Sequence, residues 1–426
     1  MSEAVLFAPK PGNIFNEHIN EYFERARAEN HRIEAICGKW NFEDLIPGLS
    51  DFDTRFLMSD DTAPEEWQDI ARAVYRVHTD ICREDPGRAR ILEHLPGINL
   101  KWEEALEITS YYPEFKQWTV YRAPEDRKKR FERYLESRPW DPIEELFNLK
   151  KFALYFTPYD RNIDPPINMH EFESKYPLHS RIMHYFCPPL QSAVSIRLKR
   201  MVKGKLESFR LARSLFPREE VIGECLGILD RHYEAPDYYR EPLLSEFETR
   251  LFDYLREALR AILPDITIID AAPDDTSVEL REKLGRVRAG LWNRFFDGAK
   301  FSRLMMGRLY FYAENIPHFD SLWLIENELK RIRRLFFETT VTAFGMIVWD
   351  RDMTPEETLE RCRGDYLTDD DYRAVKAYAD AFGRPYDAAS IKAYAGEIAG
   401  TIGPFQAVLE KLIPVVRKKA VEAGGM

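Results

Sequence analysis

The first 122 residues mix two kinds of hydrophobic pattern. Apolar residues recur at helical spacing over residues 13–30 and 62–85, which predicts a helix in each segment. Residues 62–65 (TAPE) have the sequence of a capping box at the start of the second helix. Alternation of period two predicts strands over residues 31–37 and 51–58, and short β-prone runs follow at 98–102, 106–112 and 118–122.

After Pro124 the pattern changes to helical spacing, and residues 266–269 are the one clear strand-like exception. The sequence therefore predicts an α+β protein. A mixed sheet with flanking helices would occupy residues 1–123, and a large, mainly α-helical domain would occupy residues 124–426. The pair Pro188-Pro189 and the segment 271–275 are the strongest candidates for internal breaks, with a sub-boundary near 265–275.

Composition narrows the classes of protein. Of the 426 residues, 45% are hydrophobic, 13% aromatic and 31% charged, a profile that excludes a largely disordered chain. Five widely spaced cysteines without a C-x-x-C pair indicate buried or incidental thiols in a reducing compartment. The net charge of −11 argues against broad nucleic-acid binding. No apolar run reaches the roughly 18 residues of a membrane span and no signal-peptide pattern is found, so a cytoplasmic location is expected.

One segment carries candidate chemistry. Gly38 and Lys39 follow the first predicted strand, and Asp51 and Asp53 stand on the second. Residues two apart on a strand share a face, so both carboxylates would project together, about 7 Å apart, while Phe52 points into the core. Two such carboxylates can hold divalent ions about 3.5–4 Å apart, and Mg²⁺ prefers carboxylates plus substrate phosphates. A glycine at the end of the preceding strand lets backbone amides approach phosphate oxygens closely.

This arrangement, with Ser50 before Asp51, resembles the polymerase-β-like nucleotidyltransferase superfamily. Residues 51–60 (DFDTRFLMSD) look most like the aminoglycoside 6-adenylyltransferase branch, and the resemblance covers residues 31–122. It implies a nucleotidyltransferase-like sheet and transfer of a nucleoside monophosphate from a nucleoside triphosphate, with ATP expected first, to a small-molecule acceptor. Two Mg²⁺ ions would be held by Asp51 and Asp53, and Gly38, Lys39 and Ser50 would lie at the nucleotide.

The chain departs from the family at one position. Where the family has a small serine or glycine after the strand-ending glycine, this chain has Lys39. A lysine could reach a triphosphate as a point charge, or it could block the close approach that a small residue permits.

The resemblance also implies a third carboxylate on a later strand, which would complete the metal site. An acid with apolar neighbours in a β-prone run is the expected pattern, and Leu106-Glu107-Ile108 fits it best. Glu107 is therefore the predicted third ligand, expected on the same open face as Asp51 and Asp53. Glu93 and Glu104 are the rivals.

Other clusters have ordinary explanations. His170, His179 and His184 lack the spacing of ligands on one helix face. The basic runs at 197–205 and 330–334 are typical of solvated helix faces, although one of them could meet phosphates. Two alternatives to the nucleotidyltransferase remain: a non-catalytic binding or scaffolding protein with a degenerate site, and a helical oxidoreductase or metalloenzyme centred on residues 170–184. The sequence identifies neither the acceptor nor the oligomeric state.

Overall fold

The protein is seen in a computed structural model, which describes residues 13–39, 52–85, 88, 92, 95–156, 177–230, 241–314 and 321–423. Ser50, Asp51, Glu93 and His170 lie outside these residues. The architecture combines a small sheet with many helices, and the α+β class predicted from the sequence is confirmed.

Four strands form one mixed sheet in the order β3-β2-β1-β4. The central strand β1 (Ile33–Gly38) pairs antiparallel with β2 (Thr54–Met58) and with β4 (Thr119–Arg122). The short edge strand β3 (Asn99–Lys101) runs parallel to β2. All five residues of β2 are buried, because helices cover both faces of the sheet.

Two groups of helices cover the sheet. One face, including Ile36 and Phe56, packs on α2 (Asn13–Glu29) and α3 (Trp67–Glu84), which follows the 3₁₀ turn η2 (Pro64–Glu66). The other face, including Cys37 and Leu57, packs on α5 (Trp102–Ala105), the 3₁₀ segment η3 (Pro113–Gln117) and α6 (Glu125–Ser137). The predicted helices at 13–30 and 62–85 are thereby confirmed.

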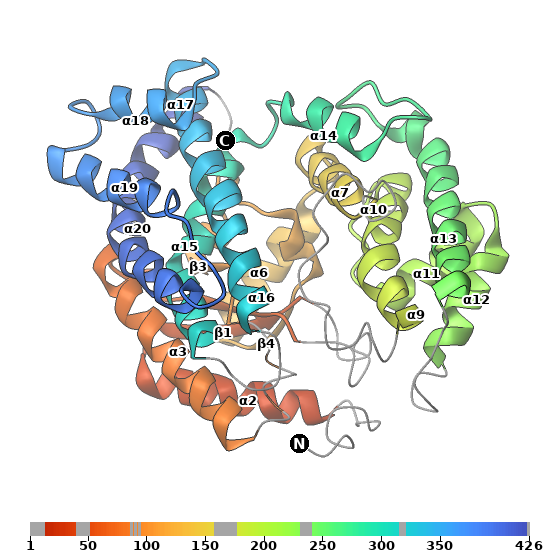
Figure 1. Cartoon of the computed structure of the whole chain (residues 1–426), viewed down its shortest axis with the longest axis horizontal. Helices are drawn as coiled ribbons and strands as arrows, with labels where there is room; N and C mark the ends of the chain where they lie inside the picture. Colours follow the sequence, from red (N-terminus) through yellow and green to blue (C-terminus); the bar gives the residue numbers. More distant parts are fainter. Residues whose placement is uncertain are drawn as a thin grey trace.

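The next elements form a separate cluster that we call the helical lobe, drawn in yellow to green in Figure 1. Its first helix is α7 (Pro142–Tyr155), which packs on α10 and α14. The other elements are α9 (Pro177–Ser180), the π-helical η5 (Arg181–Phe186), α10 (Cys187–Leu198), α11 (Lys205–Leu215), α12 (Glu219–Asp230), α13 (Glu241–Ile262), the 3₁₀ turn η6 (Leu263–Asp265) and α14 (Ser277–Gly285).

The C-terminal helices return to the sheet. The long helices α15 (Leu291–Ala313) and α20 (Ile391–Glu422) pack on each other, and α15 also packs on α3. Between them lie α16 (Ser321–Arg331), the π-helical η7 (Ile332–Glu338), α17 (Thr339–Trp349), α18 (Pro355–Cys362) and α19 (Asp369–Ala381). The largest apolar cluster joins residues 19–95 to residues 295–416. We call the sheet with α2 to α6 and α15 to α20 the sheet lobe (Figure 1).

This packing bears on the predicted domains. Residues 124–426 are mainly helical, as predicted, and the described part of this range contains no strand beyond one isolated bridge. The 123/124 boundary itself stays a prediction, since the largest apolar cluster draws residues from both sides of it. The change from the cluster of the helical lobe to that of the sheet lobe falls between Val287 and Leu291.

Three local predictions are wrong. Residues 106–112 form turns and not a strand, because Asn293 and Lys300 of α15 donate to the carbonyl oxygens of residues 108–111 that a neighbouring strand would otherwise use. Residues 266–269 are not a strand either, because the amides of Thr267 and Ile268 donate to the Glu145 carboxylate. The cap before α3 uses Glu66, which accepts from the Ala63 amide, and not Glu65.

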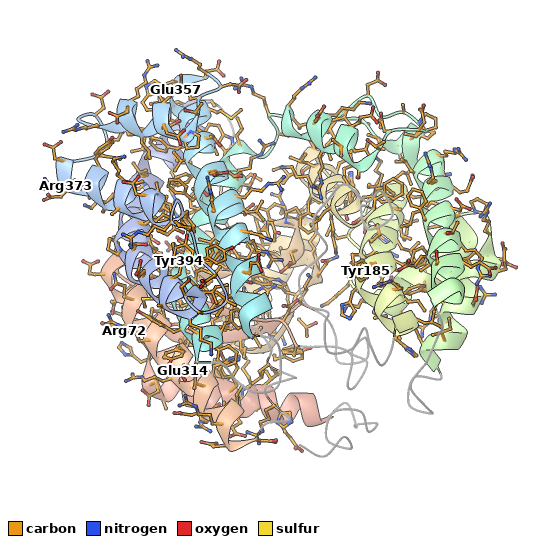
Figure 2. The ribbon with its side chains drawn as sticks, viewed as in Figure 1. Arg72, Tyr185, Glu314, Glu357, Arg373 and Tyr394 are labelled. Atoms are coloured by element: carbon orange, nitrogen blue, oxygen red, sulfur yellow. The ribbon has the colours of Figure 1, made fainter. Side chains whose placement is uncertain are left out.

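The outer surface carries many charged side chains, including Arg72 of α3 and Arg373 of α19, which project from the edge of the sheet lobe (Figure 2). All five cysteines are free, as their spacing predicted, and all five are buried. Within the described part of the chain, no helix combines the length and the apolar character that crossing a bilayer requires.

Candidate functional site

The candidate site lies where β1 ends and β2 begins. Gly38 is the last residue of β1 and pairs with Thr54 on one side and Thr119 on the other. Asp53 immediately precedes β2, whose first residue is Thr54, so the predicted strand over residues 51–58 starts later than expected. The backbone amide of Lys39 donates to the carbonyl oxygen of Asp53 at 3.2 Å. The glycine–lysine pair and the second aspartate of the predicted motif therefore meet at one point.

Gly38 is needed there for a packing reason. A Cβ atom at this position would lie 2.2 Å from Cζ of Phe52, which is closer than any side chain tolerates. Phe52 is buried and its ring contacts Tyr121 of β4 at 5.5 Å between centroids, so the ring has little room to move. The predicted burial of Phe52 is confirmed, and the small residue at the end of β1 is explained by this ring without reference to a ligand.

Four charged side chains surround this point. The Nζ atom of Lys39 lies 3.9 Å from Oδ2 of Asp53 and 3.5 Å from Oε2 of Glu114. Arg55 of β2 reaches the same two acids, with Nη1 3.8 Å from Oδ1 of Asp53 and Nη2 3.1 Å from Oε1 of Glu114. Asp53 keeps 27% of its side chain exposed and Lys39 keeps 19%, whereas Arg55 and Glu114 are buried. The exposed carboxylate is thus the outermost acid of the group.

Glu114 of η3 anchors the two cations. Burial acts to raise the pKa of Glu114, but the charges of Lys39 and Arg55 outweigh it and hold the pKa below its ordinary value. The indole Nε1 of Trp118 also donates to Oε1 of Glu114 at 3.0 Å. Glu114 is therefore an anion at neutral pH, and its charge holds Lys39 and Arg55 beside Asp53.

The helical lobe contributes a further cation. Lys151 of α7 is half-buried, and its Nζ lies 3.0 Å from Oε1 of Gln191 on α10. Burial is the largest cause that lowers the pKa of Lys151 to about 7, and the charge of Lys39 lowers it further, while Glu114 acts in the opposite direction. Residues of the two lobes therefore share one electrostatic environment at this point.

The predicted third carboxylate has other contacts. Glu107 lies in a turn after α5 and not on a strand, so that part of the prediction is wrong. Its Oε2 lies 3.0 Å from Nε of Arg417 on α20. Burial raises the pKa of Glu107, and the opposing charge of Arg417 does not restore it. A role for Glu107 beside the aspartates stays a prediction.

Of the other predicted site residues, some lie outside the described ranges and one is paired elsewhere. Asp51, Ser50 and Glu93 lie outside the described residues, so their roles stay predictions. Glu104, the second rival for the third acid, is buried and accepts two hydrogen bonds from Arg303 of α15, at 2.6 and 2.8 Å. The later strands β3 and β4 consist of Asn99–Lys101 and Thr119–Arg122, and neither contains a carboxylate.

A metal ion would need more donors than the described residues supply. Within the described ranges, no three or more His, Cys, Asp or Glu side chains gather as a metal site. His179 and His184, which the helical metalloenzyme hypothesis requires, are among the described residues and belong to no such group. Asp53 offers a partly exposed carboxylate, whereas Glu114 is buried and engaged with two cations. The described side chains therefore fit Mg²⁺ only together with a second carboxylate such as Asp51.

Sequence reasoning missed Glu114 and Lys151. Glu114 stands between the apolar residues Pro113 and Phe115, the same pattern that favoured Glu107, and it precedes a true strand. Lys151 follows Lys150 in a helix whose other face is apolar, and no local signal distinguishes it from a solvated lysine. Comparison with protein-family models, curated proteins and solved structures gives no match to this chain.

Proposed function

We propose that this protein is a metal-dependent nucleotidyltransferase, which moves a nucleoside monophosphate from a nucleoside triphosphate, ATP in the first place, to a small-molecule acceptor. In this proposal the sheet is nucleotidyltransferase-like, and Gly38, Lys39 and Ser50 would lie at the nucleotide. Asp53 with Asp51 would bind Mg²⁺, with Glu107 as the further ligand suggested by the sequence.

One observation supports the proposal above others. The residue that follows the strand-ending glycine and the second aspartate of the Asp-x-Asp pair are joined by the Lys39–Asp53 backbone hydrogen bond. Eleven residues separate Lys39 from Asp51, and the antiparallel pairing of β1 with β2 brings the two ends of this connection together. Their meeting is what a site needs if one segment is to hold phosphates and the other the metal.

Each charged side chain can then be given a role in nucleotide binding. Lys39 and Arg55 supply positive charge beside Asp53, where a triphosphate would bring negative charge, and charge-assisted hydrogen bonds of this kind are about twice as strong as neutral ones. Glu114 keeps both cations in place when no nucleotide is bound. Bound Mg²⁺ would activate the acceptor hydroxyl or amine and neutralise charge on the leaving pyrophosphate.

The test is transfer of label. Purified protein is incubated with Mg²⁺, each α-³²P nucleoside triphosphate in turn and a pool of small hydroxyl and amine acceptors, and both labelled product and released pyrophosphate are measured. Asp53→Asn should lower the rate by roughly a thousandfold, since each metal effect is worth several kcal/mol. Asp61→Asn is the matched control, because Asp61 follows the other end of β2, is 74% exposed and pairs with Arg32. It should retain full activity.

A second candidate function is nucleotide binding without transfer. It is favoured by the two cations within ion-pair distance of the Asp53 carboxylate, since Lys39 and Arg55 could replace the metal ions electrostatically. In that case the same assay gives no labelled product with any nucleotide, while calorimetry still detects binding of a nucleotide without Mg²⁺. If the folded wild-type protein neither binds a nucleotide nor transfers label, both candidate functions are contradicted.

A further inference from the structure

Lys151 is held in place by a chain of hydrogen bonds that joins the two lobes. Gln191 of α10 uses its Oε1 to accept from Lys151 and its Nε2 to donate to the carbonyl oxygen of Val202 at 3.0 Å. The same carbonyl accepts from Nε2 of Gln117 at 2.9 Å, and Gln117 is the last residue of η3, the segment that carries Glu114. The lysine of the helical lobe is therefore positioned relative to the acid that holds Lys39.

Charged groups from several elements act on Lys151. After burial, the largest causes of its low pKa include Lys39 at the end of β1 and Lys205 at the start of α11, both of which lower it. Cys187 of α10 and Glu114 of η3 act to raise it. Lys203, just before α11, lies close enough to the sheet for its charge to lower the pKa of Cys37. Within the described residues, cations from both lobes thus converge beside Glu114.

We propose that Lys39, Lys151 and Lys205 form one binding site for the triphosphate of the nucleotide, spanning the two lobes, and that Lys151 takes up a proton when the anion binds. The inference rests on the proposed function only for the identity of the ligand, because the site is made of lysines and not of the metal-binding acids. It adds a role for the helical lobe and a dependence on pH.

The physical argument is linkage. A lysine beside other cations resists protonation, and an anion placed among them removes the repulsion and stabilises the charged form. With a pKa of about 7, about nine in ten Lys151 side chains are neutral at pH 8 and about half are neutral at pH 7. Binding that restores an ordinary lysine pKa therefore takes up close to one proton at pH 8, about half a proton at pH 7, and almost none at pH 6.

The experiment is calorimetry of the full-length protein with ATP in EDTA, where turnover does not contribute. Titrations at pH 8 in buffers of different ionisation enthalpy give the number of protons taken up. A terminal phosphate has a second pKa near 6, so the probe is already ionised at this pH. Wild-type protein should take up most of one proton at pH 8 and a smaller fraction of a proton at pH 7.

Three variants sharpen the test. Lys151→Arg keeps the charge permanently, so ATP should still bind while proton uptake at pH 8 disappears. Lys151→Gln should weaken ATP binding at pH 7 at least about tenfold, the usual effect of losing a charge-assisted hydrogen bond. Lys376→Gln on α19 is the control, since this lysine is 59% exposed and pairs with Asp380, and it should change neither quantity.

The outcomes separate this inference from the proposed function. ATP binding without proton uptake at pH 8, or uptake that persists in Lys151→Arg, overturns the inference even if the wild-type protein transfers nucleotides. Proton uptake that disappears in Lys151→Arg upholds it even if the label-transfer assay gives no product. Variants that lose cooperative thermal unfolding are replaced by Lys205→Gln, which removes a second cation of the site and should also weaken ATP binding.

Discussion

The backbone amide of Lys39 donates a hydrogen bond to the carbonyl oxygen of Asp53 at 3.2 Å, one step beyond the last residue pair of the β1–β2 ladder. The bond extends the sheet register into the candidate site. It also fixes the starting points of two side chains of opposite charge, whose Nζ and Oδ2 atoms lie 3.9 Å apart. Anything that moves the end of β1 will therefore move the candidate acid.

Gly38→Ala should be such a change. The new Cβ would lie 2.2 Å from Cζ of the buried Phe52, and overpacking of a core typically costs about 1–3 kcal/mol. The midpoint of urea unfolding measures the loss. Adding Phe52→Leu shortens the opposing side chain, so the double variant should lose less stability than the sum of the two single variants.

The control for Gly38→Ala is Gly400→Ala on the exposed face of α20, where no atom lies within 4 Å of a new Cβ. Alanine is the better residue in a helix interior, so Gly400→Ala should stabilise the protein by about 0.5–1 kcal/mol. If Gly38→Ala is equally harmless, Phe52 does not restrict this position and a ligand-based reason for the glycine gains weight.

Arg303 should be the most sensitive buried cation of α15. It donates to Glu104 at 2.6 and 2.8 Å and to Glu410 of α20 at 2.9 Å, so one guanidinium links three elements. Arg303→Met leaves two buried carboxylates without this partner, which should cost about 3–5 kcal/mol in urea unfolding. Arg373→Met, at an exposed pair with Asp370 on the outer edge of α19 (Figure 2), should cost less than about 0.5 kcal/mol.

The same ion pair predicts a loss of stability in acid. Burial acts to raise the pKa of Glu104, but the charge and hydrogen bonds of Arg303 outweigh it and lower the pKa to about 2. Because the folded state holds its proton more weakly than the unfolded chain, the stabilisation is complete above about pH 4.5 and is lost as the pH falls towards 2. Unfolding curves between pH 5 and 2 should show this fall in the wild-type protein and a smaller fall in Arg303→Met.

Glu144 of α7 should give the opposite dependence of stability on pH. Its carboxylate accepts from the hydroxyl of Tyr111 at 2.6 Å, yet burial, together with Asp141, raises its pKa to about 7. The folded state then holds this proton more tightly than the unfolded chain does. Stability should therefore fall by up to about 3 kcal/mol as the pH rises from about 4.5 to 7.

Glu144→Gln should remove that part of the pH dependence, and thermal midpoints measured from pH 5 to 8 would show a flatter profile. Glutamine preserves the capping-box position at the start of α7. The exposed Glu136→Gln on α6 should leave the wild-type profile unchanged. A wild-type midpoint that rises steadily from pH 5 to 7 would show that burial does not govern this acid.

Much of the fold could be predicted because its signals are local. The buried stripe of α3, with Ile70, Val74 and Ile81, shows helical spacing in the sequence, and β1 shows alternation. The strand predicted at 106–112 failed because its partners are not local. The carbonyl oxygens of residues 108–111 accept from Asn293 and Lys300, which are more than 180 positions away in the chain, and no pattern in the run itself reports that.

The candidate site was likewise predicted only in part from the sequence. Gly38, Lys39 and Asp53 stand close in sequence, and their spacing was enough to predict that they belong together. Glu114 of η3 contacts Lys39 only in the folded chain, and the packing of α7 against η3 brings Lys151 near both. No local sequence pattern shows these neighbours. The third acid was predicted from apolar neighbours alone, a pattern that Glu107 and Glu114 share.

The most informative single change is Lys39→Ser, which introduces the small residue that the polymerase-β-like nucleotidyltransferases have after the strand-ending glycine. If Lys39 contacts the triphosphate, the variant should bind ATP about tenfold more weakly, since a charge-assisted hydrogen bond is lost. If Lys39 blocks the approach of phosphate to the backbone, ATP binding and transfer should both increase. We expect the first outcome, because the ion pair with Glu114 holds Nζ beside Asp53 and in the field of Lys151.

Lys39→Ser should also fold, which makes its effect on ligand binding interpretable. Glu114 keeps its contacts with Arg55 and Trp118, so the buried carboxylate remains paired when Lys39 is removed. Removing the positive charge of Lys39 should moreover raise the pKa of Lys151, and the proton uptake at pH 8 should become smaller than in the wild-type protein. Lys376→Ser is the control for both measurements. Unchanged proton uptake in Lys39→Ser would show that the two lysines do not share one anion site.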